Sequence, residues 1–248
     1  MEISLGAEKI FSIGSFPVTN PLLISWVIIL FLAFIAFYLK NKIKEIPKGL
    51  QNVVESLVEA ALKFMSDVVG NRAEAIKFFP IVFTIFIFVL LSNLVEIVPG
   101  LGTIGIWQIH EGKETLIPFV RSSSADLNVT LAIALVSFFA VQFFGILILG
   151  VKHYGKKFFV APWQKPYFVG TFVGLLEFIS EFAKIISFSF RLFGNIFAGE
   201  VLLTVILFLV PYVIPLPFLF LEIFVGFIQA LVFSSLTLVF LKMAITEH

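Results

Sequence analysis

Long apolar runs restrict this chain to a membrane fold. The segment 22–39 holds 18 consecutive residues without a charged side chain, and the segment 127–151 is also uncharged. An α-helix needs about 20 apolar residues to cross a hydrocarbon layer about 30 Å thick. Charged residues make up 13% of the chain, against about 25% in a soluble domain. We therefore expect an all-α polytopic membrane protein that forms a single membrane domain over residues 1–248.

About five helices are expected to cross the membrane, and one more is expected to lie on its inner surface. The first three spans are predicted at 22–39, 78–98 and 127–151. In the segment 47–77, apolar residues recur at helical spacing and charged residues lie elsewhere, which is typical of an amphipathic helix. Its charges cancel, so it is expected to lie on the inner surface or to dock on a partner subunit.

The segment 167–210 contains no proline and is too long for an ordinary span. As one helix it would be about 66 Å long, and a single crossing would need a tilt of about 60°, beyond the usual range. Two spans with a turn between them are the alternative. Because a polar stripe continues through the supposed turn, we favour one strongly tilted helix. A proline-rich turn and a last helix at 218–243 complete a hairpin over about 167–243.

Lysines predict how the chain crosses the membrane. Four lysines follow the first span, and the segment 152–165 carries four lysines and no acidic residue. Basic loops face the cytoplasm, so the N-terminus is expected outside and the C-terminus in the cytoplasm. Residues 99–126 are expected to form an outer loop. A net charge of +1 gives no reason to expect nucleic acid as a partner, and the absence of cysteine excludes disulfides and thiolate metal sites.

One arginine stands inside an otherwise apolar stretch of the long helix. A cation at mid-bilayer costs roughly 2.5–3.5 kcal/mol, so Arg191 must face protein or water. The functional interpretation competes with a structural arginine that pairs with a neighbouring helix. Helical spacing of 100° per residue places five polar residues within an arc of roughly 80°: Glu177, Glu181, Lys184, Arg191 and Asn195. The nearest charged residue to Arg191 along this face is Lys184, also a cation, so the counter-charge is expected on another helix or another chain.

Antiparallel pairing of the last two helices predicts an order of polar groups across the membrane. A fold about residue 214 places Glu200 opposite about residue 228, beside Gln229, and places Arg191 opposite about residue 237. Glu222 then lies nearest the outer turn. Carboxyl groups lead inward from both faces, and an arginine, which keeps its proton, stands between them. This order suits a device in which a mobile carboxylate of a partner takes up a proton on one side and releases it on the other.

Four further polar residues are secondary candidates for the ion path, together with Glu181 and Lys184: Asn93, Glu96, Asp126 and Asn128. Glu96 is also explained as an interfacial carboxylate, and the segment 122–126 as the N-terminal cap of the third span. The three histidines lie outside the spans, without the spacing of metal ligands. No metal or cofactor is expected.

Three segments resemble subunit a of F-type ATP synthases. They are Phe190–Glu200, Ser124–Thr130, and Gln229-Ala230 followed by an apolar run. The resemblance covers essentially residues 20–248. It implies a non-catalytic stator subunit of a bacterial plasma membrane, packed against a rotating ring of c subunits and joined by peripheral-stalk b subunits and the remaining subunits.

The resemblance also implies roles for particular residues. Arg191 matches the arginine that pairs with the ring carboxylate and separates two half-channels. Glu200 and Glu222 match the outer channel, Asn195 and Gln229 match polar positions beside the arginine, and Glu177 matches the inner channel. Some family members have histidine at the position of Glu222. The transported ion is expected to be H⁺ or Na⁺.

Two other classes of protein remain open from the sequence. A self-contained secondary transporter should show an internal repeat, and none is visible. A structural subunit of a membrane redox complex would need paired histidines or cysteines within its spans. A phosphate-binding loop of the type Gly-x-x-x-x-Gly-Lys-Ser/Thr is absent, so we expect any nucleotide chemistry to reside in another chain.

Overall fold

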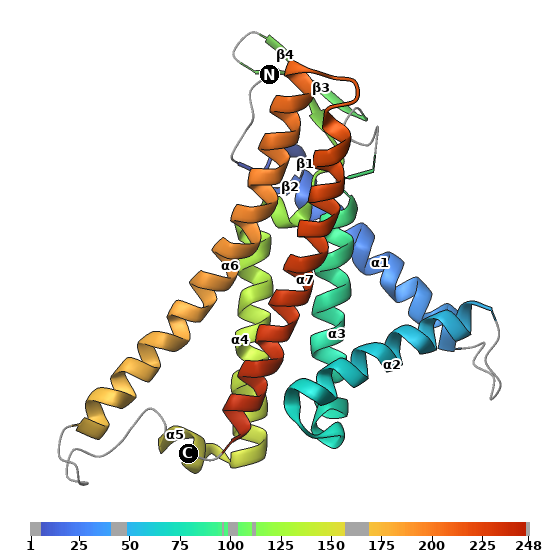
Figure 1. The fold of residues 1–248 in the computed structure, drawn as a ribbon. Helices are drawn as coiled ribbons and strands as arrows, with labels where there is room; N and C mark the ends of the chain where they lie inside the picture. Colours follow the sequence, from blue (N-terminus) through green and yellow to red (C-terminus); the bar gives the residue numbers. More distant parts are fainter. Residues whose placement is uncertain are drawn as a thin grey trace.

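The computed structural model describes residues 6–40, 49–95, 97–98, 104–110, 113–156 and 169–246. Helices dominate this part of the chain (Figure 1). Five described helices are long and apolar enough to cross a membrane: α1 (Asn20–Lys40), α3 (Arg72–Val95), α4 (Leu127–Leu149), α6 (Val169–Leu209) and α7 (Pro215–Ile245). The predicted all-α polytopic architecture with about five spans is confirmed.

The amphipathic segment is shorter than predicted. Helix α2 (Leu50–Val69) ends at Gly70, which adopts a φ of 76° and donates its backbone N–H to the carbonyl of Ser66. Glycine takes up this left-handed conformation at little cost and so ends the helix. The Asn71 side chain then accepts the N–H of Ala73, and α3 begins at Arg72. The predicted continuation of one helix to residue 77 was therefore wrong, and the second span begins six residues before the predicted start.

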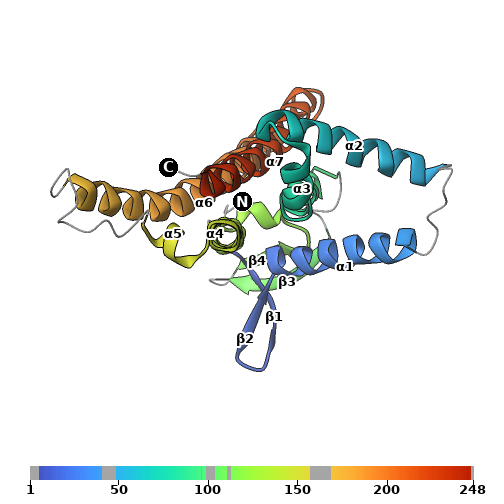
Figure 2. The same ribbon diagram turned by 90° about the horizontal axis from the view of Figure 1, so that it is seen from below.

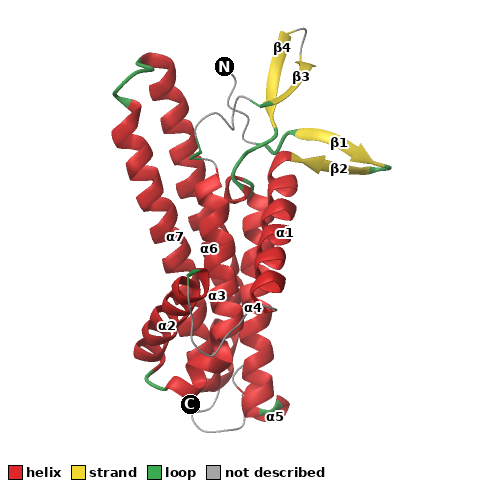
Figure 3. Ribbon diagram, turned by 90° about the vertical axis from the view of Figure 1, so that its right-hand side faces the viewer, coloured by secondary structure: helices red, strands yellow, loops and turns green. Residues whose placement is uncertain are grey.

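Two β-hairpins lie at one end of the helix bundle (Figures 1 and 3). Strands β1 (Lys9–Ile13) and β2 (Phe16–Thr19) form one antiparallel pair, and β3 (Gly105–His110) and β4 (Lys113–Pro118) form the other. β3 and β4 lie within the predicted outer loop at 99–126 and form a hairpin there that the sequence did not predict. We call this the hairpin end, and the opposite end, where α7 finishes, the C-terminal end. The short helix α5 (Val151–Lys156) lies at the C-terminal end.

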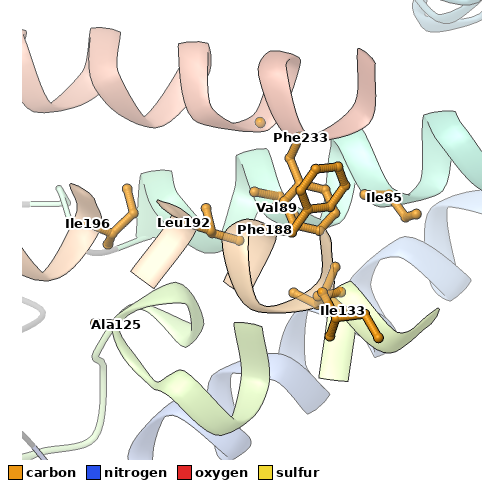
Figure 4. Close-up of a cluster of buried hydrophobic side chains, with 11 residues drawn as sticks. Ile85, Val89, Ala125, Ile133, Phe188, Leu192, Ile196 and Phe233 are labelled. Carbon is orange, nitrogen blue, oxygen red and sulfur yellow. The ribbon is translucent and has the colours of Figure 1, made fainter. Parts of the chain in front are cut away.

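Helices α3, α4 and α7 form the centre of the bundle, and α6 leans away from them towards its N-terminal end (Figures 1 and 2). α6 is one continuous helix of 41 residues, which runs through Gly194 and Gly199. A cluster of buried apolar side chains joins it to α3, α4 and α7 (Figure 4). Its centre includes the rings of Phe188 and Phe233, whose centroids are 4.9 Å apart.

Candidate functional site

Arg191 lies in the C-terminal half of α6, and its side chain is exposed. Its Nη2 donates a long hydrogen bond of 3.5 Å to Ser187 Oγ, one turn away on the same helix. Among the described residues, no acidic side chain forms an ion pair with this guanidinium. Because a guanidinium keeps its charge at any accessible pH, the described part of the chain leaves this cation without a counter-charge.

The exposure of Arg191 follows from how α6 packs. Phe188, Leu192 and Ile196 recur at a spacing of four and are buried against the neighbouring helices (Figure 4). Four residues along a helix return to nearly the same face. Arg191 and Asn195 lie at another angle on the helix and are both exposed. The apolar stripe thus fixes α6 in an orientation that presents the two polar side chains at the surface of this chain.

Glu200 forms a largely buried ion pair with Arg121, which was not among the predicted site residues. Arg121 Nε lies 2.9 Å from Glu200 Oε1, and Nη2 lies 3.0 Å from Oε2. A third nitrogen, Nη1, donates to the carbonyl of Gly6 at 3.0 Å. The Arg121 side chain is only 6% exposed. Two-point contacts of this kind fix geometry as well as charge, so Glu200 is anchored in place.

The segment that carries Arg121 is itself tied into the bundle by buried serines. The hydroxyl of Ser122 donates to the carbonyl of Ser92 on α3, and Ser123 bonds to Ser25 and to the carbonyl of Pro21 on α1. A short 3₁₀ helix, η2 (Ser123–Ala125), results. The sequence signal for this arrangement was one cation beside a run of small polar residues, although this signal does not indicate which acid the cation binds.

The side chain of Glu222 on α7 lies beside Gly199 of α6. A Cβ atom built on Gly199 would lie 2.7 Å from Glu222 Oε1. α6 ends at Leu209 and α7 begins at Pro215. The ring of Phe188 contacts both Phe233, at 4.9 Å, and Phe240, at 5.5 Å, so these contacts place the centre of the pairing between about residues 210 and 214. The carboxyl group of Glu222 thus reaches the level of Glu200 on α6.

Gln229 lies on α7 between Glu222, whose side chain reaches Gly199, and Phe233, whose ring contacts Phe188. It therefore lies along the part of α6 that carries Arg191 and Asn195. The side chain of Glu222 is buried, and its Oε2 has no hydrogen-bond partner among the described residues.

Glu181 is the centre of a second buried polar group, nearer the C-terminal end. Lys184 Nζ lies 2.8 Å from Glu181 Oε1, and Gln142 Nε2 donates to Oε2 at 3.2 Å. The hydroxyl of Tyr154 on α5 donates to Gln142 Oε1 at 2.7 Å. Lys184 Nζ also lies 4.6 Å from the ring centre of Phe240. The nearest cation to Arg191 on the polar face is thus bound to an acid of its own helix.

The remaining predicted residues differ in their surroundings. Glu177 is half-buried on α6, one turn before Glu181. Asn93 is buried on α3 and donates to the carbonyl of Gly226 on α7 at 2.9 Å. Asp126 caps α4 by accepting a hydrogen bond from the backbone N–H of Asn128. The start of this helix therefore explains why both residues are polar. Glu96 lies outside the described residues. No cluster of possible metal ligands occurs in the described part of the chain.

These groups define a polar arrangement along α6. Arg121, Glu200 and Glu222 lie towards the hairpin end, and the Glu181 group lies towards the C-terminal end. Arg191 stands between them. Carboxyl groups within membrane helices mark ion paths. A guanidinium does not release its proton, so this cation can balance a carboxylate but cannot pass protons from one group to the other.

The sequence is similar to proteins of one family over nearly its whole length. The model of the family described as ATP synthase A chain matches residues 22–242. ATP synthase subunit a of Moorella thermoacetica is 31% identical over 241 residues, which cover 97% of each chain. ATP synthase subunit a of Helicobacter pylori is 34% identical and covers 96% of each chain. The protein of the same name from Helicobacter acinonychis is also 34% identical.

Proposed function

Because the chain belongs to the ATP synthase A chain family, as a non-catalytic integral membrane subunit of the ATP synthase, we propose that it carries ions across the membrane at its interface with a rotating ring of c subunits. The ion, H⁺ or Na⁺, crosses in two half-channels that open on opposite sides of the membrane. Ion flow down its gradient turns the ring and so drives ATP synthesis in other subunits.

One observation carries this proposal: Arg191 is exposed and has no acidic partner among the described residues. A charge in a membrane helix needs compensation, and the ring would supply it as a carboxylate that passes Arg191 once per step. The neighbouring acids Glu200 and Glu181 are already held by Arg121 and Lys184. They therefore do not compete for Arg191.

Each half-channel has its own residues in this proposal. Glu200 and Glu222 belong to the outer half-channel at the hairpin end, and Glu177, with Glu181 and Lys184, belongs to the inner one. Asn195 is exposed one turn from Arg191 on the same helix, and Gln229 is at a similar level on α7. These two amides provide polar surface where an ion leaves or reaches the ring carboxylate.

The proposed setting is a bacterial plasma membrane, with the hairpin end outside, the C-terminal end in the cytoplasm, and peripheral-stalk b subunits as further partners. The lysine-rich segments support this orientation. The chain has no native cysteine, so a Ser12→Cys variant gives one thiol at the hairpin end. A membrane-impermeant maleimide should label this thiol in intact cells. Labelling only after the cells are opened would show that the hairpin end faces the cytoplasm.

Cysteine crosslinking tests the ring interface. An Asn195→Cys variant is combined with a cysteine beside the ring carboxylate on the c subunit, and the membranes are oxidised. We expect a disulfide between the two subunits that stops pumping until it is reduced. A Phe34→Cys variant on exposed α1 is the control and should not crosslink. Crosslinking of the control in place of the α6 variant would refute the proposed interface.

A further inference from the structure

Two carboxyl groups meet at the hairpin end of α6 and α7, but their surroundings differ. Glu200 is held by a buried guanidinium through two nitrogen–oxygen contacts of 2.9 and 3.0 Å. Glu222 also lies at the contact between α6 and α7, because its side chain is next to Gly199. It nevertheless forms no ion pair within the described residues, and its buried Oε2 lacks a hydrogen bond there. One carboxyl group thus has a fixed counter-charge and the other has none.

Arg121 is placed so that it cannot easily follow a moving ion. Its side chain is 6% exposed, and a third guanidinium nitrogen, Nη1, donates a hydrogen bond to the carbonyl of Gly6. The next two residues, Ser122 and Ser123, are hydrogen-bonded to α3 and α1 respectively. Separating a buried ion pair leaves an uncompensated charge in a poorly solvated site. The pair between Arg121 and Glu200 is therefore a fixed part of the structure.

We propose that Arg121 is a positioning residue of the outer half-channel: it anchors Glu200 as a permanently paired carboxylate and leaves Glu222 as the group that exchanges the transported ion. The inference rests on the proposed function, because it assigns roles within that half-channel. An arriving cation supplies to Glu222 the positive charge that Arg121 already supplies to Glu200. The Glu200 carboxylate, held by Arg121, lines the half-channel next to Glu222.

A double-mutant comparison separates the two roles. Arg121→Gln and Glu200→Gln each leave one buried charge without its partner, and each is expected to lower ATP-driven pumping per assembled complex about tenfold. The double variant removes both charges and should recover most of the lost pumping. Glu222→Gln should not pump, either alone or combined with the double variant. Arg72→Gln, which breaks the exposed pair with Glu59 on α2, is the matched control and should pump normally.

A second readout distinguishes positioning from simple structural support. The charged groups around Glu200 are Arg121 from the segment before η2, Glu8 from the segment before β1, and Glu222 from α7. In Arg121→Gln, Glu200 loses its counter-charge and becomes a second carboxylate that can take up the arriving cation. The dependence of ATP synthesis on outer pH should therefore differ from the parent profile, whereas Arg121→Lys, which keeps the charge, should stay near it.

Three results would overturn the inference. One is a double variant as inactive as Glu200→Gln, because Glu200 would then exchange the ion itself. Another is normal pumping by Glu222→Gln. The last is an unchanged pH profile in Arg121→Gln with losses explained by fewer assembled complexes, which would reduce the pair to structural support. Each is distinguishable from failure of the proposed function, in which an assembled Arg191→Ala variant would still pump.

Discussion

At the scale of single residues, two ion pairs flank Arg191 along α6. Arg121 holds Glu200 towards the hairpin end, and Lys184 holds Glu181 towards the C-terminal end. Both acids are thereby matched in charge within the chain, whereas no described acidic side chain pairs with Arg191. The sequence indicated Arg191 because a lone cation in an apolar helix is visible without tertiary structure. The partner of Glu200 was not visible, since Arg121 is 79 residues away in the chain.

The Glu181 group gives a prediction about stability. Glu181→Ala leaves the ammonium of Lys184 partly buried without its carboxylate and also removes the acceptor for Gln142. Loss of one partner of a buried pair costs up to about 3–5 kcal/mol. We expect a lower temperature of thermal unfolding for the detergent-solubilised protein.

The control for this prediction removes the charge of Lys184 as well. Replacing the pair by Glu181→Leu and Lys184→Met together should restore much of the lost stability, because apolar side chains of similar size tolerate burial. A double variant less stable than Glu181→Ala would show that Lys184 does not depend on Glu181 for its compensation.

At the scale of elements, the contact between α6 and α7 sets the level of every proposed path residue. The spans themselves were predictable from apolar runs, and the continuous α6 from its lack of proline. The particular contacts between α6 and α7 were not predictable, because long side chains such as Glu222 and Phe188 reach along the neighbouring helix. The Gly70 turn and the two hairpins were also missed, since short strands and a single glycine give weak signals beside long apolar helices.

Two glycines of α6 offer a direct test of that contact. Gly199→Ala would bring a methyl group to 2.7 Å from Glu222 Oε1, whereas Gly194 has open space around its missing side chain. Alanine otherwise favours a helix over glycine by roughly 0.5–1 kcal/mol. We therefore expect Gly199→Ala to lower the unfolding temperature and Gly194→Ala to preserve or raise it. Equal effects of the two substitutions would contradict the close approach of Glu222 to α6.

At the scale of the whole molecule, the chain places one fixed cation between two polar regions that lead to opposite ends of the bundle. Core packing holds Phe188, Leu192 and Ile196 inward (Figure 4) and so keeps Arg191 at the surface. The sequence predicted that the counter-charge lies off this helix, and the described residues supply none. In the proposed function this counter-charge belongs to another subunit, and the sequence of this chain alone could not identify it.

ATP-driven pumping by an Arg191→Ala variant tests this account most directly. Membrane vesicles containing the assembled complex are given ATP, and ion uptake is followed with a fluorescent dye. The account predicts that the variant assembles with the ring, since Arg191 is not buried within the chain, but that uptake falls to background because nothing compensates the ring carboxylate as it passes. Normal uptake by an assembled variant would contradict the role assigned to Arg191.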